Sequence, residues 1–246
     1  MSETLFRTMA DPIRLRVLSY NVQGHGRLFL RRYLERIARA ISEAEPDVVG
    51  LQEVHRHTWH SRFEDQAEIL ARLTGMDVHF GRSFAPEKGG EFGNAVLTRR
   101  PVRSSEVHLL PGTGEPRTLL HTRLDLAGFE LDFYVTHLAA WGRWGRAARS
   151  MQIGGLVERL RQRSEPFVLV GDFNAVPGAP EVKALMAERI FRVCGEEMAC
   201  THRIMRQRID YVLADPGWTT TDARVLQAGP SDHWPVLVEL HRETSS

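Results

Sequence analysis

The stretch RTLLHTRLDLAGFELDFYVTHL, residues 117–138, decides the fold that the sequence predicts. Two β-rich runs, 117–126 and 129–138, are separated only by Ala127 and Gly128, which is the spacing of a tight hairpin. A helical pattern then covers about residues 144–163, and the apolar run PFVLVGD (166–172) follows it. A hairpin joined to a helix crossover indicates a mixed sheet rather than a uniform strand–helix–strand repeat.

Short strands and helices alternate in both directions from this stretch, without a linker or a repeat. Further strands are predicted over residues 15–22, 47–54, 76–84, 93–99, 104–110, 207–215, 222–228 and 234–240, and further helices over 31–44, 63–75 and about 180–187. So many strands do not fit one flat sheet, so we expect two mixed sheets packed face to face with helices on the outer sides. We place them in a single domain, residues 14–241, between an N-terminal extension (1–13) and a C-terminal tail (242–246).

The composition is that of an ordinary globular protein, with 42% hydrophobic and 26% charged residues among 246. A formal net charge of +1 gives no global attraction to nucleic acid or anionic lipid. No run reaches the roughly 18 apolar residues of a membrane span, and the first residues lack the apolar segment of a secretory signal. We therefore expect a cytoplasmic monomer, with Cys194 and Cys200 reduced.

Polar side chains stand at or near the ends of several predicted strands. They are Asn21, Glu53, His137, Asp172, Asn174, Asp210, Asp232 and His233. The end of a strand holds a side chain rigidly beside the crevice in which α/β sheets place their binding and catalytic sites. Taken singly, each has an ordinary explanation, since a lone histidine such as His137 is more often a core residue and Asn174 fits a turn. Together they form an oxygen-rich set suited to Mg²⁺ or Mn²⁺.

The order of the motifs then points to a family. The set YNVQG, LQEV, GNAVLTR, THL, GDFNAVP, RIDYVL and SDHWPV resembles the endonuclease/exonuclease/phosphatase superfamily, over a region from about Arg14 to Leu240. Members of that superfamily include pancreatic deoxyribonuclease, abasic-site endonucleases, bacterial sphingomyelinases and inositol polyphosphate 5-phosphatases. The resemblance implies a four-layer α/β sandwich, in agreement with the two packed sheets expected above.

The resemblance also implies a role for each residue at a strand end. Glu53 would be the principal metal ligand, and Asn21 and Asp232 would complete the metal shell. Asp172 and Asn174 would orient the attacking water and hold a phosphate oxygen. His233 would contact the scissile phosphate with Asp210 fixing its tautomer, and His137 would be a second phosphate contact. Whether Asp172 or His233 takes the proton of the water stays open.

Several weaker features bear on the substrate. Arg117 would reach a phosphate, or else be a solvated arginine at a strand edge, and Asn94 of GNAVLTR is placed among the substrate contacts. Trp141, Arg143 and Trp144 follow His137, and they would stack on bases, contact lipid or simply pack on the core. The run HRHTWH (55–60) is interpreted as a solvated loop, the alternative being a wall of the site.

These expectations favour a hydrolase that cleaves a phosphoester, most simply a phosphodiester, by metal-assisted attack of water. A nuclease and a phospholipid or sugar-phosphate hydrolase remain open within that class. A histidine at position 137, where abasic-site endonucleases tend to carry tyrosine, disfavours DNA repair. A catalytically inactive binding member of the fold is disfavoured because Glu53, Asp172 and His233 are all present. A nucleic-acid-binding module with incidental acids is disfavoured by the near-neutral charge.

Overall fold

A computed structural model describes residues 12–24, 30–86, 89–140 and 145–243, which form two six-stranded β-sheets. Across the first sheet the strands are β11 (Thr219–Val225), β12 (Val236–Arg242), β1 (Ile13–Asn21), β2 (Val48–Arg56), β4 (Glu91–Thr98) and β3 (Asp77–Phe84). The central strands β1 and β2 run parallel, and the other neighbours are antiparallel. This sheet is therefore mixed, as the sequence predicts.

The second sheet contains the hairpin predicted from residues 117–138. Its strands, in order across the sheet, are β5 (Val102–Leu109), β6 (Thr118–Leu126), β7 (Phe129–His137), β8 (Phe167–Asp172), β10 (Asp210–Ala214) and β9 (Arg192–Val193). Leu126 pairs with Phe129 across the turn, and the helix α3 (Gly145–Arg161) connects β7 to its parallel neighbour β8. The hairpin and the helix crossover are both confirmed, whereas the two-residue strand β9 was not predicted.

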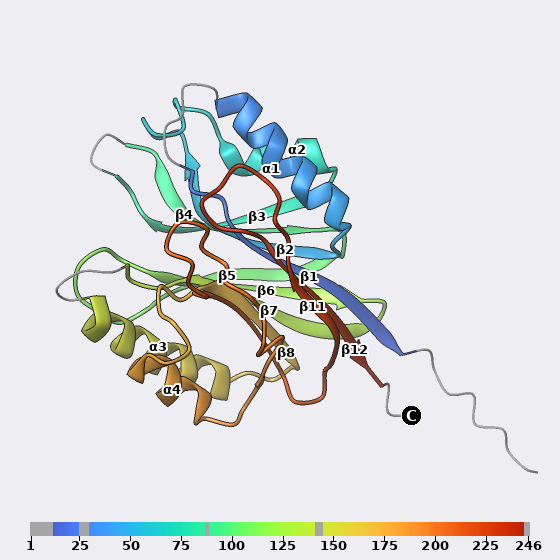
Figure 1. The fold of residues 1–246 in the computed structure, drawn as a ribbon. Helices are drawn as coiled ribbons and strands as arrows, with labels where there is room; N and C mark the ends of the chain where they lie inside the picture. Colours follow the sequence, from blue (N-terminus) through green and yellow to red (C-terminus); the bar gives the residue numbers. More distant parts are fainter. Residues whose placement is uncertain (1–11, 25–29, 87–88, 141–144, 244–246) are drawn as a thin grey trace, which may run out of the picture.

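The helices cover the outer faces of the two sheets and complete four layers (Figure 1). The helices α1 (Leu30–Ala44) and α2 (Gln66–Thr74) lie on the first sheet, and α3 and α4 (Pro180–Met186) lie on the second. On α1, Leu30, Leu34, Ile37 and Ile41 are buried at the three- and four-residue spacing of one helical face. The predicted four-layer sandwich, with helices on both outer sides, is confirmed.

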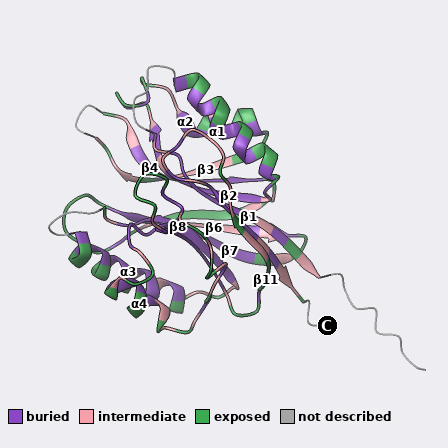
Figure 2. Cartoon of the chain, in the orientation of Figure 1, coloured by how far each residue is buried: buried purple, intermediate pink, exposed green. Residues whose placement is uncertain are grey.

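The sheets meet at a closely packed interface of apolar side chains. Val17, Val48, Val135 and Val170 belong to the buried cluster between them, and the buried residues concentrate in these inner layers (Figure 2). A Cβ at Gly50 would lie 2.2 Å from Val170 Cγ2, so a residue with a side chain would push the sheets apart. The parallel pairs β1–β2 and β7–β8 thereby lie close together at the centre of the sandwich.

The structure also bears on the cysteines and on membrane spans. Cys194 is buried, Cys200 is half-buried, and both are free thiols. Among the described residues, no helix combines the length and the apolar character that a membrane crossing requires.

Candidate active site

Strand ends of both sheets meet in one hydrogen-bonded cluster. Asn21 ends β1, His137 ends β7 and Asp172 ends β8, as predicted. The Asn21 Nδ2 group donates to Glu53 Oε1 at 3.2 Å and to Asp172 Oδ2 at 3.1 Å, and so it links the two sheets. Asp210 differs from the others because it begins its strand, β10, which is antiparallel to β8 and brings Asp210 beside Asp172.

Glu53 is positioned by a β-bulge and not by the end of its strand, which corrects the expectation from the sequence. β2 continues to Arg56, and its register with β4 shifts between Leu51 and Val54. Glu53 lies within this irregularity with a left-handed φ of 59° and lines the cleft. A left-handed residue other than glycine costs about 1–3 kcal/mol, and such strain is common where a bulge aims a functional side chain.

Gly24 explains why the YNVQG motif ends in glycine. Its N–H donates to the Glu53 carbonyl at 3.1 Å, and a Cβ at this position would lie 2.3 Å from that same carbonyl oxygen. Only glycine therefore permits the close approach that secures the bulge.

On the second sheet, His137, Asp172 and Asn174 form a buried triad. Asn174 has a left-handed φ of 49°, which asparagine tolerates well, and its N–H donates to Asp172 Oδ1 at 2.8 Å. Its side-chain Nδ2 donates to His137 Nε2 at 2.9 Å, so the proton of a neutral His137 resides on Nδ1. Burial, aided by Arg117 and His233, lowers the pKa of His137 well below its usual value, so the ring is neutral.

The pKa values of Asp172 and His233 are both raised, which suits proton exchange. Burial raises the pKa of Asp172 to about 7, and the nearby Asp210 carboxylate adds to the shift. Burial alone would lower the pKa of His233, but Asp210 and Asp172 outweigh it and raise that pKa to about 10. His233 is therefore an imidazolium at neutral pH.

The orientation of His233 is fixed by Asp210. Its Nδ1 donates to Asp210 Oδ2 at 2.9 Å, which leaves Nε2 facing the cleft at 3.7 Å from Asp172 Oδ2. His137 Nε2 lies 3.5 Å from the same Asp172 oxygen. One carboxylate oxygen thus lies between two imidazole rings from different sheets.

Asp232 lies on a more accessible side of the cluster. It is half-buried, and Gln23 Nε2 donates to its Oδ2 at 2.6 Å. His202, which was not predicted, has its Nε2 3.8 Å from Asp232 Oδ2 and packs edge-on against His233. The ligand atoms of His202, Asp232 and His233 lie within 4.8 Å of one another, but a protonated His233 ring has no lone pair to offer a cation.

The donor set fits a hard divalent cation on its oxygen side. Glu53 and Asp232 supply carboxylates to the same cleft. Asn21 turns its Nδ2 to the carboxylates while its Oδ1 accepts one hydrogen bond, from the Gln23 N–H at 2.9 Å. In this structure Asn21 holds Glu53 and Asp172 in place.

These residues open into a cleft of about 580 Å³. Of the predicted residues, it is lined by Glu53, Arg117, His137, Asp172, Asn174, Asp232 and His233. Asn21 and Asp210 are buried behind this lining. The sequence did not single out Gln23, Phe84, Phe92, Glu115 or Met205, which also line the cleft. His55 and His60 line it too, so two residues of the run 55–60 contribute to a wall, while His57, Trp59 and His60 are exposed to solvent, as the solvated-loop interpretation expects.

The predicted substrate contacts have mixed outcomes. Arg117 is buried in the cleft wall, not solvated, with Nη2 2.7 Å from Glu115 Oε1, and its Nε and Nη1 have no hydrogen-bond partner in the described chain. Asn94 is buried and donates to the Thr118 carbonyl at 3.2 Å, and it is not among the described residues that line the cleft. Trp141, Arg143 and Trp144 lie outside the described residues.

The segment that follows His137 is anchored from α3. Gln152 accepts from the Ala139 N–H at 2.8 Å, and Arg149 donates to the Ala139 carbonyl at 3.1 Å. Arg149 also forms a buried ion pair with Glu181 at 2.9 Å. Arg149 therefore supports the loop beside the site and does not face the cleft.

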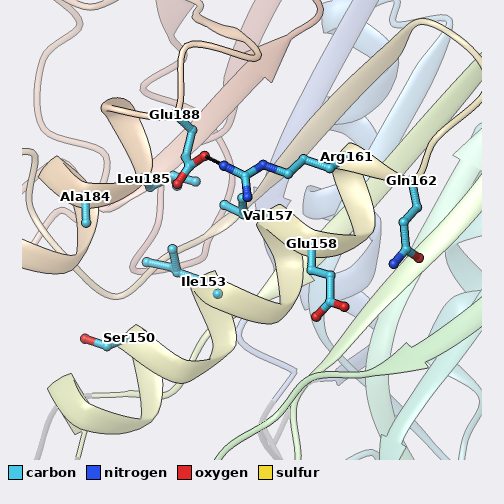
Figure 3. Close-up of a pocket in the computed structure, with 10 residues that line it drawn as sticks. Ser150, Ile153, Val157, Glu158, Arg161, Gln162, Ala184, Leu185 and Glu188 are labelled. Atoms are coloured by element: carbon cyan, nitrogen blue, oxygen red, sulfur yellow. Dashed lines mark hydrogen bonds and ion pairs between the residues drawn. The ribbon is translucent and has the colours of Figure 1, made fainter.

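A second cavity, of about 540 Å³, lies between α3 and α4 (Figure 3). Its floor includes Ile153, Val157 and Leu185, and the Arg161–Glu188 ion pair crosses one side of it. None of the residues at the strand ends lines it. The cleft between the sheets is therefore the candidate active site.

Comparisons with known proteins agree with this geometry. A sequence model of the Endonuclease/Exonuclease/phosphatase family matches residues 18–233. Among solved structures, an endonuclease/exonuclease/phosphatase family protein from Bacteroides thetaiotaomicron superposes with a TM-score of 0.79 at 20% identity, covering 96% of this chain and 100% of that one. The mannosyl-6-phosphatase Bt3783 of the same organism gives 0.76 at 21% identity, covering 92% and 99%. These two likenesses show the fold.

A curated relative shares part of the sequence. Protein cwh43 of Schizosaccharomyces pombe is 31% identical over 137 residues, which is 55% of this chain. The match spans only 14% of the length of that relative.

Proposed function

Because this chain belongs to the endonuclease/exonuclease/phosphatase family, we propose that it hydrolyses a phosphoester, most simply a phosphodiester, with the help of Mg²⁺ or Mn²⁺. One observation carries the proposal. The buried Asp172 carboxylate, with its pKa raised to about 7, lies between a neutral and a cationic histidine in a cleft that also contains two accessible carboxylates. That combination provides a base, a cationic donor and an ion-binding site.

Glu53 and Asp232 would hold the cation, with Asn21 positioning Glu53. A divalent cation bound there supplies Lewis-acid stabilisation of the charge on the phosphate oxygens. Mg²⁺ typically retains several waters and takes one or two protein carboxylates, and the partial exposure of Glu53 and Asp232 suits that behaviour.

Asp172 would accept the proton of the attacking water. Its raised pKa makes the carboxylate a better base than an ordinary aspartate while leaving it partly ionised near neutral pH. Asn174 and Asn21 each donate a hydrogen bond to this carboxylate and so fix its orientation. The raised pKa of His233 favours its protonated form, so His233 would act as the donor to the phosphate.

The phosphate would be held by cationic groups at the floor and wall of the cleft. His233 directs Nε2 into the cleft because Asp210 holds Nδ1. Arg117 lines the cleft wall, where its charge would stabilise a phosphate, and its buried Nε and Nη1 have no hydrogen-bond partner in the described chain. His137 contributes a neutral ring that contacts the phosphate without adding charge.

Hydrolysis assays with and without metal test this proposal. Purified protein is offered bis-p-nitrophenyl phosphate, single- and double-stranded DNA, RNA, phospholipids and sugar phosphates. EDTA should abolish turnover, and Mg²⁺ or Mn²⁺ should restore it. Glu53→Gln should raise the metal concentration for half-maximal rate by at least about tenfold, whereas Glu43→Gln, at an exposed position on α1, should not change it.

The same assays can reject the proposal in two ways. Full turnover in EDTA would remove the metal from the mechanism. Failure to hydrolyse every phosphoester offered, with both metals present, would contradict the proposed activity.

A further inference from the structure

Two loops beside the cleft expose large apolar side chains. Trp59 and Phe63 are 61% and 56% exposed, and Ile204 and Met205 are 78% and 39% exposed. Scattered exposed apolar residues are ordinary, but grouped ones mark an interaction surface. Because His60 and Met205 both line the active cleft, the aromatic loop (residues 57–63) and the aliphatic loop (residues 203–206) both border its mouth.

The aromatic loop is held rigidly in this exposed arrangement. Thr58 and Ser61 exchange hydrogen bonds between side chain and backbone, and the Phe63 N–H donates to the Thr58 carbonyl at 2.8 Å. Arg62 and Phe63 both have left-handed φ values, 53° and 62°, which strain the backbone. The Trp59 and Phe63 rings meet edge to face at 6.1 Å. The fold thus maintains two exposed aromatic rings at a cost in backbone strain.

The aliphatic loop is anchored to the site itself. The Arg203 N–H donates to the Asp232 carbonyl at 2.8 Å, and Arg203 Nη1 donates to the Ser231 carbonyl at 3.0 Å. Arg206 turns the chain with a left-handed φ of 52°. The tip residues Ile204 and Met205 are therefore presented beside Asp232 on a short, fixed turn.

The two loops themselves carry positive charge and no negative charge. Residues 55–63 and 201–208 contain no aspartate or glutamate, and Arg62, Arg203 and Arg206 are exposed. The acids that follow the aromatic loop are paired, Glu64 with Arg31 at 3.3 Å and Asp65 with Arg56 at 2.7 Å. Apolar tips flanked by arginines match the acyl boundary and the anionic head groups of a bilayer.

We propose that the aromatic and aliphatic loops dock the mouth of the cleft on an anionic lipid bilayer, so that the phosphoester substrate is a head group at the membrane surface. The substrate class rests on the proposed function, whereas the docking does not. Single-stranded nucleic acid is the other polyanion with apolar faces, but it needs flat rings on which bases stack. Trp59 and Phe63 present such rings, but Ile204 and Met205 do not, and aliphatic tips suit acyl chains better than bases.

Vesicle binding in EDTA tests the docking without turnover. Sucrose-loaded vesicles of phosphatidylcholine, with or without an equal part of phosphatidylserine, are sedimented with the full chain. We expect binding that is stronger with phosphatidylserine and weaker at high salt. Trp59→Ser combined with Phe63→Ser should reduce binding by at least about tenfold, and Ile204→Ser should reduce it several-fold.

A matched control uses exposed apolar side chains elsewhere. Leu73→Ser combined with Val107→Ser removes two such side chains, from α2 and β5, that do not line the cleft, and should leave binding unchanged. Hydrolysis of bis-p-nitrophenyl phosphate should be the same in the loop variants as in the wild type, which verifies that they fold.

Two outcomes would overturn the docking surface. One is a wild-type chain that does not sediment with either vesicle, including the case in which it binds a single-stranded oligonucleotide instead. The other is a pair of loop variants that bind vesicles as well as the wild type. If vesicles are bound but no phosphoester is hydrolysed, the proposed function fails while the docking stands.

Discussion

The two sheets share one plan but supply different chemistry to the cleft. Each has a central parallel pair joined by a helix, β1–α1–β2 in the first sheet and β7–α3–β8 in the second. The second sheet contributes His137, Asp172 and Asp210, which are almost completely buried and hydrogen-bonded to one another or to Asn174 and His233. The first sheet contributes Glu53 on a strained bulge, and Asp232 before β12, both partly exposed.

The difference separates the proposed proton acceptor, Asp172, from the carboxylates proposed to bind the ion, whereas the proposed proton donor, His233, comes from the same segment before β12 as Asp232. Removal from water is what raises the pKa of Asp172, so its proposed role as a base depends on its burial. A Mg²⁺ site has to stay open because the ion keeps part of its water shell. Packing two sheets face to face places the buried half and the partly exposed half next to each other, and Asn21 bridges them with two hydrogen bonds.

The largest expected effect concerns Asp172, in the buried half of the site. Asp172→Asn should lower the rate on any accepted substrate by about 10²–10⁴-fold, because it removes the proton acceptor. Its free energy of unfolding should not fall, since burial already disfavours the charge that the substitution removes. Rates and urea unfolding curves measure the two effects. A folded variant that kept more than roughly a tenth of the wild-type rate would show that the base lies elsewhere.

At Asp132, on β7 of the same sheet, the pKa shifts in the opposite direction from that of Asp172. Burial alone would raise the pKa of Asp132, but its hydrogen bonds with His121 and Arg123, both at 2.8 Å, outweigh burial and lower that pKa. A lowered folded-state pKa contributes stability that is present above the unfolded value, about 3.9, and is lost as pH falls through the folded value. Asp132→Asn should therefore lower the free energy of unfolding at pH 7 by about 1–3 kcal/mol, with catalysis unchanged.

Urea unfolding over a pH series measures this effect, and the gap between Asp132→Asn and wild type should close in acid. Asp222→Asn is a suitable control, because its partly exposed carboxylate forms an ion pair with exposed Arg224 at 3.3 Å. It should change the free energy of unfolding by less than about 1 kcal/mol. A gap that persisted unchanged to low pH would mean that packing, and not the carboxylate charge, is what Asp132 contributes.

The smallest expected effect on stability concerns Glu53, at the strained bulge of the first sheet. A left-handed residue other than glycine costs roughly 1–2 kcal/mol, and glycine loses about 0.5–1 kcal/mol more entropy on folding than other residues. Glu53→Gly should therefore raise the free energy of unfolding by about 0.5–1 kcal/mol while abolishing activity. Glu45→Gly, at the exposed left-handed residue after α1 with φ 47°, should give the same gain with activity intact. Chemical denaturation that showed a gain at Glu45 but a loss at Glu53 would indicate that the contacts of the Glu53 side chain, including the hydrogen bond from Asn21, outweigh the strain of the bulge.

Local patterns in the sequence predicted most of the fold. Alternating and continuous apolar runs located the long strands, and the spacing of Ile37 and Ile41 located α1, because these patterns report burial directly. The strand β9 was missed because two residues carry no periodicity. The domain limits 14–241, the monomeric state and the cytoplasmic location stay predictions.

The site was predictable where a residue ends a strand and unpredictable where position depends on tertiary structure. The positions of Asn21, His137 and Asp172 could be predicted because each ends a strand. The bulge at Glu53 could not be predicted from the sequence LQEV. Gln23 and His202 contact Asp232 from other segments of the chain, and a local sequence pattern cannot predict such contacts. The motifs indicated which residues form the candidate site. Only the packing of the two sheets shows that some of these residues are buried and others partly exposed.

The pairing of β12 with β1 determines when the site comes into existence. Ser231 Oγ donates to the Asn21 carbonyl at 2.8 Å, a contact between residues 210 positions apart. Closing so long a loop is an entropically expensive and slow event in folding. During synthesis, a ribosome-bound chain that has emerged only through β10 contains Glu53 and Asp172 but lacks Asp232 and His233. The cleft is therefore assembled late, and regain of activity on refolding reports the docking of β12 beside β1 more directly than any measure of helix content.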